Sequence, residues 1–271
     1  MKKILLMLLG VLLALPVVAR DFTYTYEGQT LTYTVIDEDA KTCMTKAGTY
    51  FEYTQIHKAG NQVSGDLVIP SKVTDGEVIY TVTSLGEYAF SNRSGLTSVT
   101  IPSSVTTIGK EAFWWCSGLK KAEFASVEVL CKIDFNDEVS NPLYYAHNLY
   151  INGEEITDLV IPKGVTLIGN CAFSGCSGLT SVTIPSSVTT IGHSAFVNCS
   201  GLTSVTIPEG VTSIGNSVFS SCSGLTSVSI PSSVTTIGRS AFWDCLGLEK
   251  AEFASVEALC KIDFSTDFSN P

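Results

Sequence analysis

The segment GLTSVTIPSSVTTIGHSAFVNCS has a fixed order of apolar and polar residues. In its first part, Leu179, Val182 and Ile184 have the spacing L-x-x-V-x-I, which predicts a short strand whose alternate side chains point inward. Ser181 and Thr183 lie between these positions and therefore point outward. The strand ends at the following proline, because proline has no backbone N–H to donate to a neighbouring strand.

The second part of this segment returns the chain to its start. Its V-T-T-I motif predicts a second extended stretch, and Gly192 allows a bend that a Cβ atom would obstruct. Ala195, Phe196 and Cys199 then predict a short helical turn with an apolar inner face. Because one such coil buries little apolar surface alone, neighbouring coils must stack.

The same order of residues recurs at an interval of 23 residues. Four segments align without gaps, and they begin at Gly95, Gly178, Gly201 and Gly224. Three further units, in residues 66–94, 118–155 and 156–177, are divergent. Repeats of this length are typical of solenoids. The sequence therefore predicts a β-rich, right-handed repeat solenoid with short strands and short helical turns over residues 66–246, with a divergent insert at 118–155.

The repeated pattern L-x-x-V-x-I-P-x-x-V-x-x-I-G-x-x-A-F-x-x-C resembles the BspA-type leucine-rich repeat proteins of anaerobic bacteria and some parasitic protists. The pattern begins at Leu96, Leu179, Leu202 and Leu225, and the resemblance extends from Asp66 to the C-terminus. It implies a curved solenoid at the cell surface that acts as an adhesin, with host matrix proteins or other microbes as partners. It implies no catalytic residues and no cofactor.

The N-terminal region does not follow the repeat. Lys2 and Lys3 precede an apolar run over 4–15, which is shorter than the roughly 20 residues that span a bilayer. Small residues then lead to Arg20, so residues 1–19 are typical of a secretory signal peptide. No second apolar segment of this kind follows, so we expect an exported protein without a membrane span after cleavage.

Residues 20–65 predict a β cap. Phe22 and Tyr24 alternate with polar residues, as do Leu31 and Tyr33, on either side of a polar turn at Gly28, which is a hairpin pattern. Such a cap would cover the apolar edge of the first coil, as the ends of solenoids require. The alternative is a small ligand-binding domain.

A second, longer repeat occurs near the end of the chain. The segment KAEFASVEVLCKIDFNDEVSNP from Lys121 recurs from Lys250 with 17 of 22 positions identical. After the first copy the chain re-enters the 23-residue repeat, and after the second it ends at Pro271. We therefore expect residues 247–271 to be an incomplete C-terminal repeat of a truncated product.

The net charge argues against one class of partner. The 26 acidic and 16 basic residues give a formal charge of -10, whereas nucleic-acid binding requires a basic surface. A hydrophobic content of 45% also argues against disorder. Between Gly178 and Leu246 only Glu209, Arg239 and Asp244 carry formal charge, so the outer face of the repeats is predicted to be neutral.

Cysteine is the most reactive residue type in the repeat. One cysteine recurs at the same repeat position and is predicted to form a ladder of buried thiols at Cys116, Cys176, Cys199, Cys222 and Cys245. A rung spacing of about 4.8 Å is too wide for several thiolates on one zinc ion, and parallel Cβ vectors do not suit disulfides. Cys171 takes a position that is polar in other coils, so we expect it to be exposed; the alternatives there are a reactive thiol and a neutral surface substitution.

Catalytic motifs are absent from the sequence. Three histidines could serve as bases, namely His57, His147 and His193, and His193 takes a position that is polar or charged in other coils. The chain contains neither a P-loop nor an H-E-x-x-H motif. The acidic run 37–39 lacks the glycine and the distal glutamate of an EF-hand, so it predicts a solvated turn and no metal site. We therefore predict a protein that is not an enzyme.

The outward strand positions are the candidate binding site. They form hydroxyl columns that suit an extended protein partner, although serine and threonine also serve as soluble, strand-compatible surface residues. The columns consist of Ser98, Thr100, Ser181, Thr183, Ser204, Thr206, Ser227 and Ser229. On the helical side, Trp114, Trp115 and Trp243 are expected to pack between coils, with an exposed contact as the alternative. We expect adhesion or protein binding, with a structural spacer without a specific ligand as the alternative.

Overall fold

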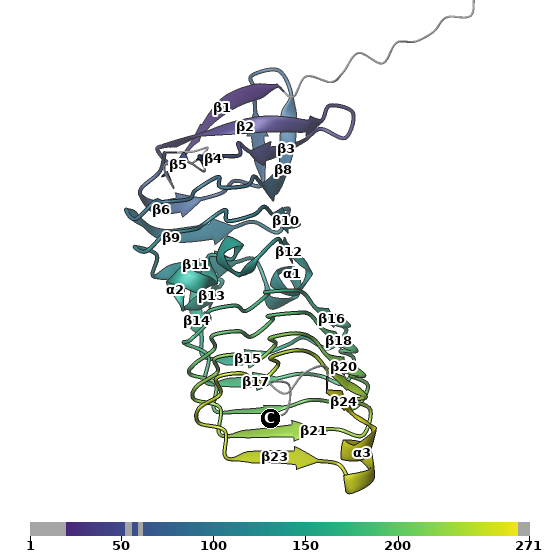
Figure 1. Cartoon of the computed structure of the whole chain (residues 1–271). Coiled ribbons are helices and arrows are strands. Elements are labelled where there is room, and N and C mark those ends of the chain that lie inside the picture. The colour runs from purple at the N-terminus through teal and green to yellow at the C-terminus, as the bar shows by residue number, and fades with distance from the viewer. Residues whose placement is uncertain (1–19, 52–55, 59–61, 265–271) are drawn as a thin grey trace, which may run out of the picture.

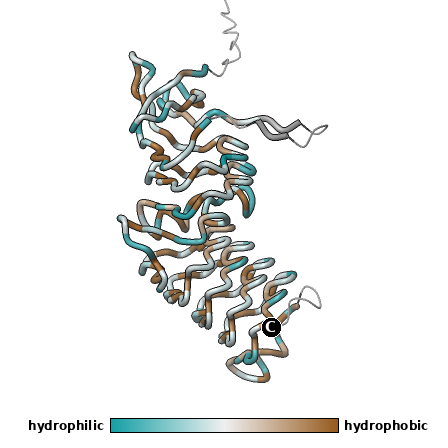
Figure 2. The backbone as a smooth tube through the Cα atoms, turned by 90° about the vertical axis from the view of Figure 1, so that its left-hand side faces the viewer, coloured by the Kyte–Doolittle hydropathy of each residue, from teal (hydrophilic) through white to brown (hydrophobic). Residues whose placement is uncertain are grey.

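The computed structural model describes residues 20–51, 56–58 and 62–264, so the predicted signal peptide lies outside the described residues. These residues form a curved stack of coils, with antiparallel strands at the N-terminal end (Figure 1). Figure 2 shows the coils edge-on as a regular series that bends near the middle of the chain. The predicted repeat solenoid is confirmed.

Each regular coil contributes one strand to each of two parallel sheets. The coil that begins at Gly178 supplies β17 (Ser181–Thr183) and β18 (Thr190–Ile191), which lie on different sides of the stack (Figure 1). The coils pair in register, with Ser181 opposite Ser204 and Thr190 opposite Ser213. A shift of 23 residues therefore brings the same side chain to the same place one coil further along the stack.

Within the described residues, the strands fall into four larger sheets and one separate pair. One parallel sheet contains β15 (Asp158–Val160), β17, β19 (Ser204–Thr206), β21 (Ser227–Ile230) and β23 (Lys250–Phe253). A second contains β16 (Leu167–Ile168), β18, β20 (Ser213–Ile214), β22 (Thr236–Ile237) and β24 (Asp263–Phe264). Nearer the N-terminus, a third contains β6 (Gly65–Val68), β9 (Leu96–Ile101), β11 (Lys121–Phe124), β13 (Leu149–Ile151) and β14 (Glu154–Ile156).

The cap continues directly into the solenoid. A fourth sheet contains β1 (Asp21–Tyr26), β2 (Gln29–Asp37), β3 (Thr42–Thr45), β7 (Lys72–Thr74), β8 (Ile79–Leu85), β10 (Thr107–Ile108) and β12 (Asp134–Phe135). The β1–β2 hairpin is present as predicted, and Leu31, Tyr33 and Val35 are buried against the core. A separate hairpin pairs β4 (Thr49–Phe51) with β5 (Ile56–Lys58).

A column of stacked phenylalanine rings fills the interior of the regular coils. Phe173, Phe196, Phe219 and Phe242 lie with neighbouring ring centroids 5.2, 5.6 and 5.5 Å apart and with interplanar angles of 17° or less. Burial of one such ring stabilises the fold by about 1.5–3 kcal/mol. The 23-residue period thus places one ring of the column in each coil.

The third side of each regular coil is a pair of tight turns. The sequence predicts a short helical turn there, and Ala195, Phe196 and Cys199 do face the core. However, Ser194 and Asn198 take left-handed backbone conformations with φ of 52° and 60°, which turn the chain instead of extending a helix. Their N–H groups donate to backbone carbonyls of the following coil, as in the 2.9 Å bond from Ser194.

The divergent insert is a complete coil followed by a hairpin. Its strands β11 and β12 pair in register with the coil before it. Its remaining turns are helical: α1 (Val127–Lys132) is N-capped by Ser126, and the 3₁₀ helix η1 (Glu138–Ser140) and α2 (Leu143–Ala146) follow. The β13–β14 hairpin then ends one sheet, and β15 begins another.

The described part of the predicted incomplete repeat, up to Phe264, has the same form as the first copy. It consists of β23, α3 (Val256–Lys261) and β24, and Ser255 caps α3 as Ser126 caps α1. Residues 265–271 lie outside the described residues.

Candidate binding face

Six of the eight predicted hydroxyl residues lie together on the sheet β15–β23. Between them, the side chains of Val182, Val205 and Val228 point inward and are buried. The hydroxyl residues on the outer side are exposed or half-buried, and they are Ser181, Thr183, Ser204, Thr206, Ser227 and Ser229. The alternation along each strand thus produces two short hydroxyl columns on one surface.

The other two predicted residues lie elsewhere. Ser98 and Thr100 are on β9, in the sheet that ends at the β13–β14 hairpin. Their neighbours on the next strand are Lys121 and Glu123, which are charged and form an ion pair of 2.8 Å. The structure therefore does not bring Ser98 and Thr100 into the same columns as the other six.

An aspartate occupies the first strand of each of these two sheets. Asp158 on β15 accepts hydrogen bonds from Ser181 (2.6 Å) and Thr180 (3.1 Å). These bonds hold the pKa of Asp158 below its ordinary value. Asp66 on β6 accepts from Ser98 and Thr97 in the same way, and its pKa is lowered for the same reason.

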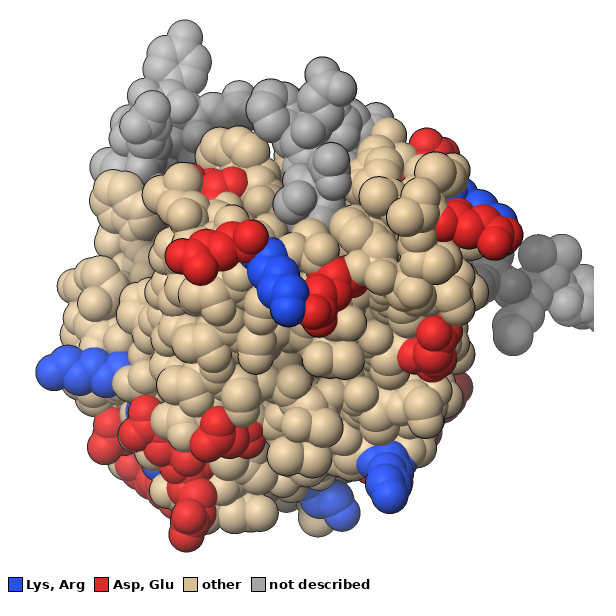
Figure 3. Space-filling model, turned by 90° about the horizontal axis from the view of Figure 1, so that it is seen from below, with Lys and Arg blue, Asp and Glu red and all other residues tan. Residues whose placement is uncertain are grey.

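The middle of the hydroxyl surface is neutral and has free hydrogen-bonding groups. At the opposite end from Asp158, Lys250 and Glu252 form an ion pair of 2.5 Å on β23. Between these ends, and within the described part of the chain, no side-chain hydrogen bond is found for Thr183, Ser204, Thr206, Ser227 or Ser229. The outer surface of β15–β23 can thus donate and accept hydrogen bonds along three consecutive coils. Figure 3 shows the molecule from its C-terminal end, where charged side chains are scattered over a largely uncharged surface.

A second hydroxyl column lies on the sheet β16–β24, where the sequence interpretation did not place a candidate site. Thr190 and Ser213 are exposed there, and Thr236 is half-buried. The sequence does contain a sign of this column: the residue before the isoleucine of V-T-T-I and V-T-S-I is a threonine or serine, and it recurs at the same 23-residue interval. This column offers a natural comparison surface for the first, because it has the same chemistry on another side of the stack.

The cysteine ladder is unpaired, and four of its five thiols are buried as predicted, whereas Cys245 is half-buried. All nine cysteines are free thiols, and four of the five ladder thiols donate to a phenylalanine carbonyl of the preceding coil, as Cys199 does to Phe173 at 3.2 Å. Burial raises the pKa of Cys116 and Cys176 to about 12, so these thiols are protonated at neutral pH.

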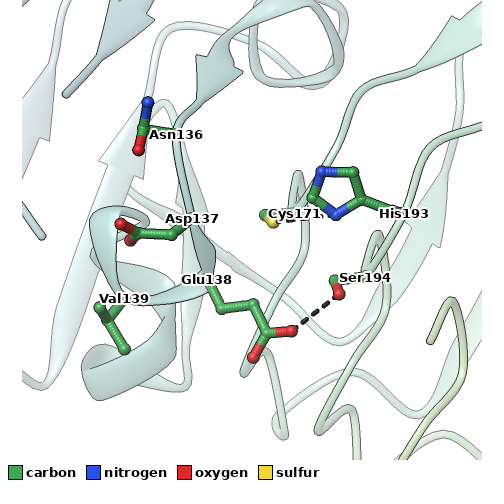
Figure 4. A pocket seen from close by; sticks show the side chains of 7 residues that line it. All are labelled: Asn136, Asp137, Glu138, Val139, Cys171, His193 and Ser194. Carbon is green, nitrogen blue, oxygen red and sulfur yellow. Dashed lines mark hydrogen bonds between the residues drawn. The ribbon is translucent and has the colours of Figure 1, made fainter. Parts of the chain in front are cut away.

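The prediction that Cys171 is exposed is wrong. Its side chain is buried in a pocket of about 350 Å³, where Sγ lies 3.9 Å from Nδ1 of His193 (Figure 4). Its polar counterpart Ser194 is also buried and donates a 2.7 Å hydrogen bond to Glu138, so a polar residue at this position does not indicate exposure. Burial, with smaller contributions from Glu138 and Asp137, raises the pKa of Cys171 to about 12. The thiol is therefore protonated and is not poised as a nucleophile.

The described residues offer no metal site. No group of three or more His, Cys, Asp or Glu side chains among them is placed to hold a metal ion. His193 is exposed, and Nδ1 of His147 lies 3.0 Å from the carbonyl of Gly175. None of the helices in the described ranges is long and apolar enough to cross a membrane.

Two of the three tryptophans are exposed, so the expectation that they pack between coils is wrong for them. Trp115 is 59% exposed and Trp243 is 52% exposed, because both project from the turn side of the stack. Trp114 is half-buried and stacks on Trp115 with ring centroids 4.8 Å apart.

Stacked coils with paired parallel sheets and an inward L-x-x-V-x-I strand define a leucine-rich repeat solenoid. The chain belongs to the BspA-type family of these proteins: the family described as "BspA type Leucine rich repeat region" matches in six copies, over residues 71–140 and 145–267. No curated protein matches the chain.

Several solved structures are similar to this chain. A leucine-rich repeat protein of T. pallidum is 21% identical over 89% of this chain and 85% of its own, with a TM-score of 0.45. A leucine-rich cell surface protein of Faecalibacterium prausnitzii is 21% identical over 89% and 97%, with a TM-score of 0.28. A pneumococcal vaccine antigen is 18% identical over 85% and 69%, with a TM-score of 0.34.

Proposed function

We propose that this protein is exported and binds a macromolecular partner, a host matrix protein or another cell-surface protein, through the outer face of β15–β23. The observation that carries the proposal is the run of unengaged hydroxyl groups at Thr183, Ser204 and Thr206, on a neutral surface that lies above a rigid apolar core. Membership of the BspA-type repeat family supports a binding role, and the signal-peptide pattern of residues 1–19 supports export.

The geometry of this face suits an extended segment of protein. The hydroxyl groups repeat once per coil, at the spacing of neighbouring strands, which is about 4.8 Å. Each hydroxyl group both donates and accepts, so the column can match alternating N–H and C=O groups of a partner backbone. Because the sheet is held by in-register pairing, little conformational entropy is lost when the partner binds.

The test adds positive charge to the outer face of β15–β23 and measures binding. The control adds the same charge to another side of the stack. Chain 20–271 and the variant Thr183→Lys with Thr206→Lys are assayed against immobilised collagen, laminin and fibronectin. The matched control is Thr190→Lys with Ser213→Lys, which adds the same charge to the outer side of β18 and β20. The proposal predicts saturable binding that the first variant loses and the control keeps.

The alternative is a structural spacer without a specific ligand, and the same assay separates the two. A spacer shows no saturable binding for any of the three chains. Unchanged binding by the Thr183 and Thr206 variant would place the site elsewhere, and equal loss in both variants would show a general effect of charge.

A further inference from the structure

On the turn side of the stack, Trp115 is an unusual residue for its place in the turn. The second left-handed residue of these turns is Asn92, Trp115, Asn198, Ser221 or Asp244, with φ between 57° and 60°, and Gly175 takes the same place with φ of 76°. Asparagine and aspartate tolerate this conformation, whereas a large aromatic residue is disfavoured in it. Burial does not compensate for the cost at Trp115, because its side chain is 59% exposed.

The divergent coil supplies a hydrogen-bond acceptor for the backbone of Trp115. In the regular turns, the N–H of the left-handed residue donates to a backbone carbonyl of the next coil, as Asn198 does to Ser220 at 2.9 Å. The N–H of Trp115 donates instead to the phenolic oxygen of Tyr145, at 2.9 Å. The contact that completes the turn therefore brings Tyr145 to the same pocket as Trp115, whose indole also stacks on that of Trp114.

Trp115 and Tyr145 line this pocket of about 430 Å³, which is within the range of small-molecule sites, about 300–1,000 Å³. Its other lining residues are Asn92 and Ser94 from the preceding coil and Ser117 from the same coil. Within the described ranges, none of these three side chains forms a hydrogen bond with another residue. The pocket thus combines two aromatic side chains with uncharged donors and acceptors that have no partner among the described residues.

We propose that this pocket binds a neutral sugar ring of a glycan, with Trp115 as the platform. A pyranose has a face of C–H groups that packs on an indole and an edge of hydroxyl groups that pairs with amides and hydroxyls. A cationic ligand would find no carboxylate among the lining residues, and an apolar protein side chain would leave Asn92, Ser94 and Ser117 desolvated without partners. This site is on the turn side, away from the hydroxyl columns of β15–β23, and does not depend on the function proposed for them.

The proposal is tested by titrating the 20–271 chain with cellobiose, maltose, lactose and N,N′-diacetylchitobiose. Calorimetry and tryptophan fluorescence measure the binding. Saturable binding of at least one of these sugars is expected. Trp115→Asn should weaken it at least about tenfold. Because asparagine holds the equivalent place at Asn92 and Asn198, this variant should keep the circular dichroism and thermal midpoint of the parent.

Two further variants make the result specific. Trp243→Ser removes an exposed tryptophan from a different coil and should leave sugar binding unchanged. Tyr145→Phe keeps the aromatic ring but removes the acceptor of the Trp115 N–H, and should weaken binding less than Trp115→Asn does.

Three outcomes would overturn the proposal: no saturable binding of any of the four sugars, unchanged binding by Trp115→Asn, or equal loss in Trp243→Ser. If Trp115→Asn instead weakens capture by the immobilised matrix proteins and sugars do not bind, Trp115 belongs to a protein-binding surface.

Discussion

The side-chain nitrogen Nδ2 of Asn141 donates a 2.8 Å hydrogen bond to the backbone carbonyl of Cys171 in the following coil. The same nitrogen donates to the carbonyl of Ala172 at 3.0 Å, and Asn141 is completely buried. In the regular turns, a backbone N–H group of the preceding coil satisfies the carbonyl at the place of Ala172, as Phe173 does for Ala195 at 2.8 Å. The carbonyl of Cys171 also accepts a 3.1 Å hydrogen bond from the N–H of Ser174 in its own turn. The side chain of Asn141 therefore replaces the one backbone donor that the Ala172 carbonyl would have in a regular coil.

We expect Asn141→Ala to lower the free energy of unfolding by about 1–3 kcal/mol, because it leaves the buried carbonyl of Ala172 without a donor. Urea denaturation followed by circular dichroism measures the change. The matched control is Asn136→Ala, an exposed asparagine of the same coil, which should change stability by no more than about 0.5 kcal/mol. Equal effects of the two variants would show that the hydrogen bonds of Asn141 do not stabilise the junction.

Close approach of neighbouring coils explains the glycine at the start of four coils, namely Gly118, Gly201, Gly224 and Gly247. A Cβ atom on Gly201 would lie 2.3 Å from the carbonyl oxygen of Ser177 and 2.7 Å from that of Leu179. We expect Gly201→Ala to destabilise the fold by about 1–3 kcal/mol, because backbone atoms must move apart. Urea denaturation measures the loss, and Ser200→Ala, at the exposed neighbour, serves as the control. A Gly201→Ala variant as stable as the parent would show that the coils separate at little cost.

The regular coils could be predicted from the sequence because each inward side chain has a counterpart 23 residues away. Val182 pairs with Val205, and Phe196 stacks between Phe173 and Phe219, so one pattern determines both local structure and packing. The junction of the divergent coil has no such redundancy. There Asp137 and Tyr145 accept backbone N–H groups of the preceding coil, and nothing in their spacing indicates which group each one meets.

The burial of Cys171 was missed for a related reason. Its counterparts in other coils are polar, and polarity usually indicates exposure. Ser194 shows that a polar residue can be buried at this place when a neighbouring segment supplies an acceptor, in this case Glu138. The exposure of Trp115 was missed for the opposite reason. Its apolar indole suggested burial, but the sequence does not show that the residue lies at a left-handed position of a surface turn.

The two copies of the longer repeat, which begin at Lys121 and Lys250, place cysteines in almost identical sequences but at different depths, so they test thiol accessibility. Cys131 is buried in the first copy, and burial raises its pKa to about 12, whereas Cys260 is exposed in the second. At about pH 8 a thiol reagent should modify Cys260 rapidly and leave Cys131 and Cys171 unmodified until the protein unfolds. Mass spectrometry of peptides from native and urea-treated protein measures this, with Cys260→Ser as the control. Rapid labelling of Cys171 in the native protein would contradict its burial.

Stability should fall at alkaline pH because of the buried cysteines. Burial raises the pKa of Cys116, Cys131 and Cys176 to about 12 in the folded protein, above their ordinary value in the unfolded chain. A raised folded-state pKa means that the unfolded chain loses these protons first, so the stabilisation is complete below the unfolded pKa and is lost as pH rises toward 12. Within that window each such thiol removes about 1.4 kcal/mol per pH unit.

Urea denaturation under reducing conditions at about pH 8, 9.5 and 10.5 should therefore give a steadily decreasing free energy of unfolding. Lysines and tyrosines also titrate in this range, so the slope is compared with that of the double variant Cys116→Ala with Cys131→Ala. That variant should be less stable at about pH 8, because each replacement leaves a small cavity, but its stability should fall less steeply with pH. Identical slopes for the two chains would mean that the buried thiols do not contribute to the alkaline loss.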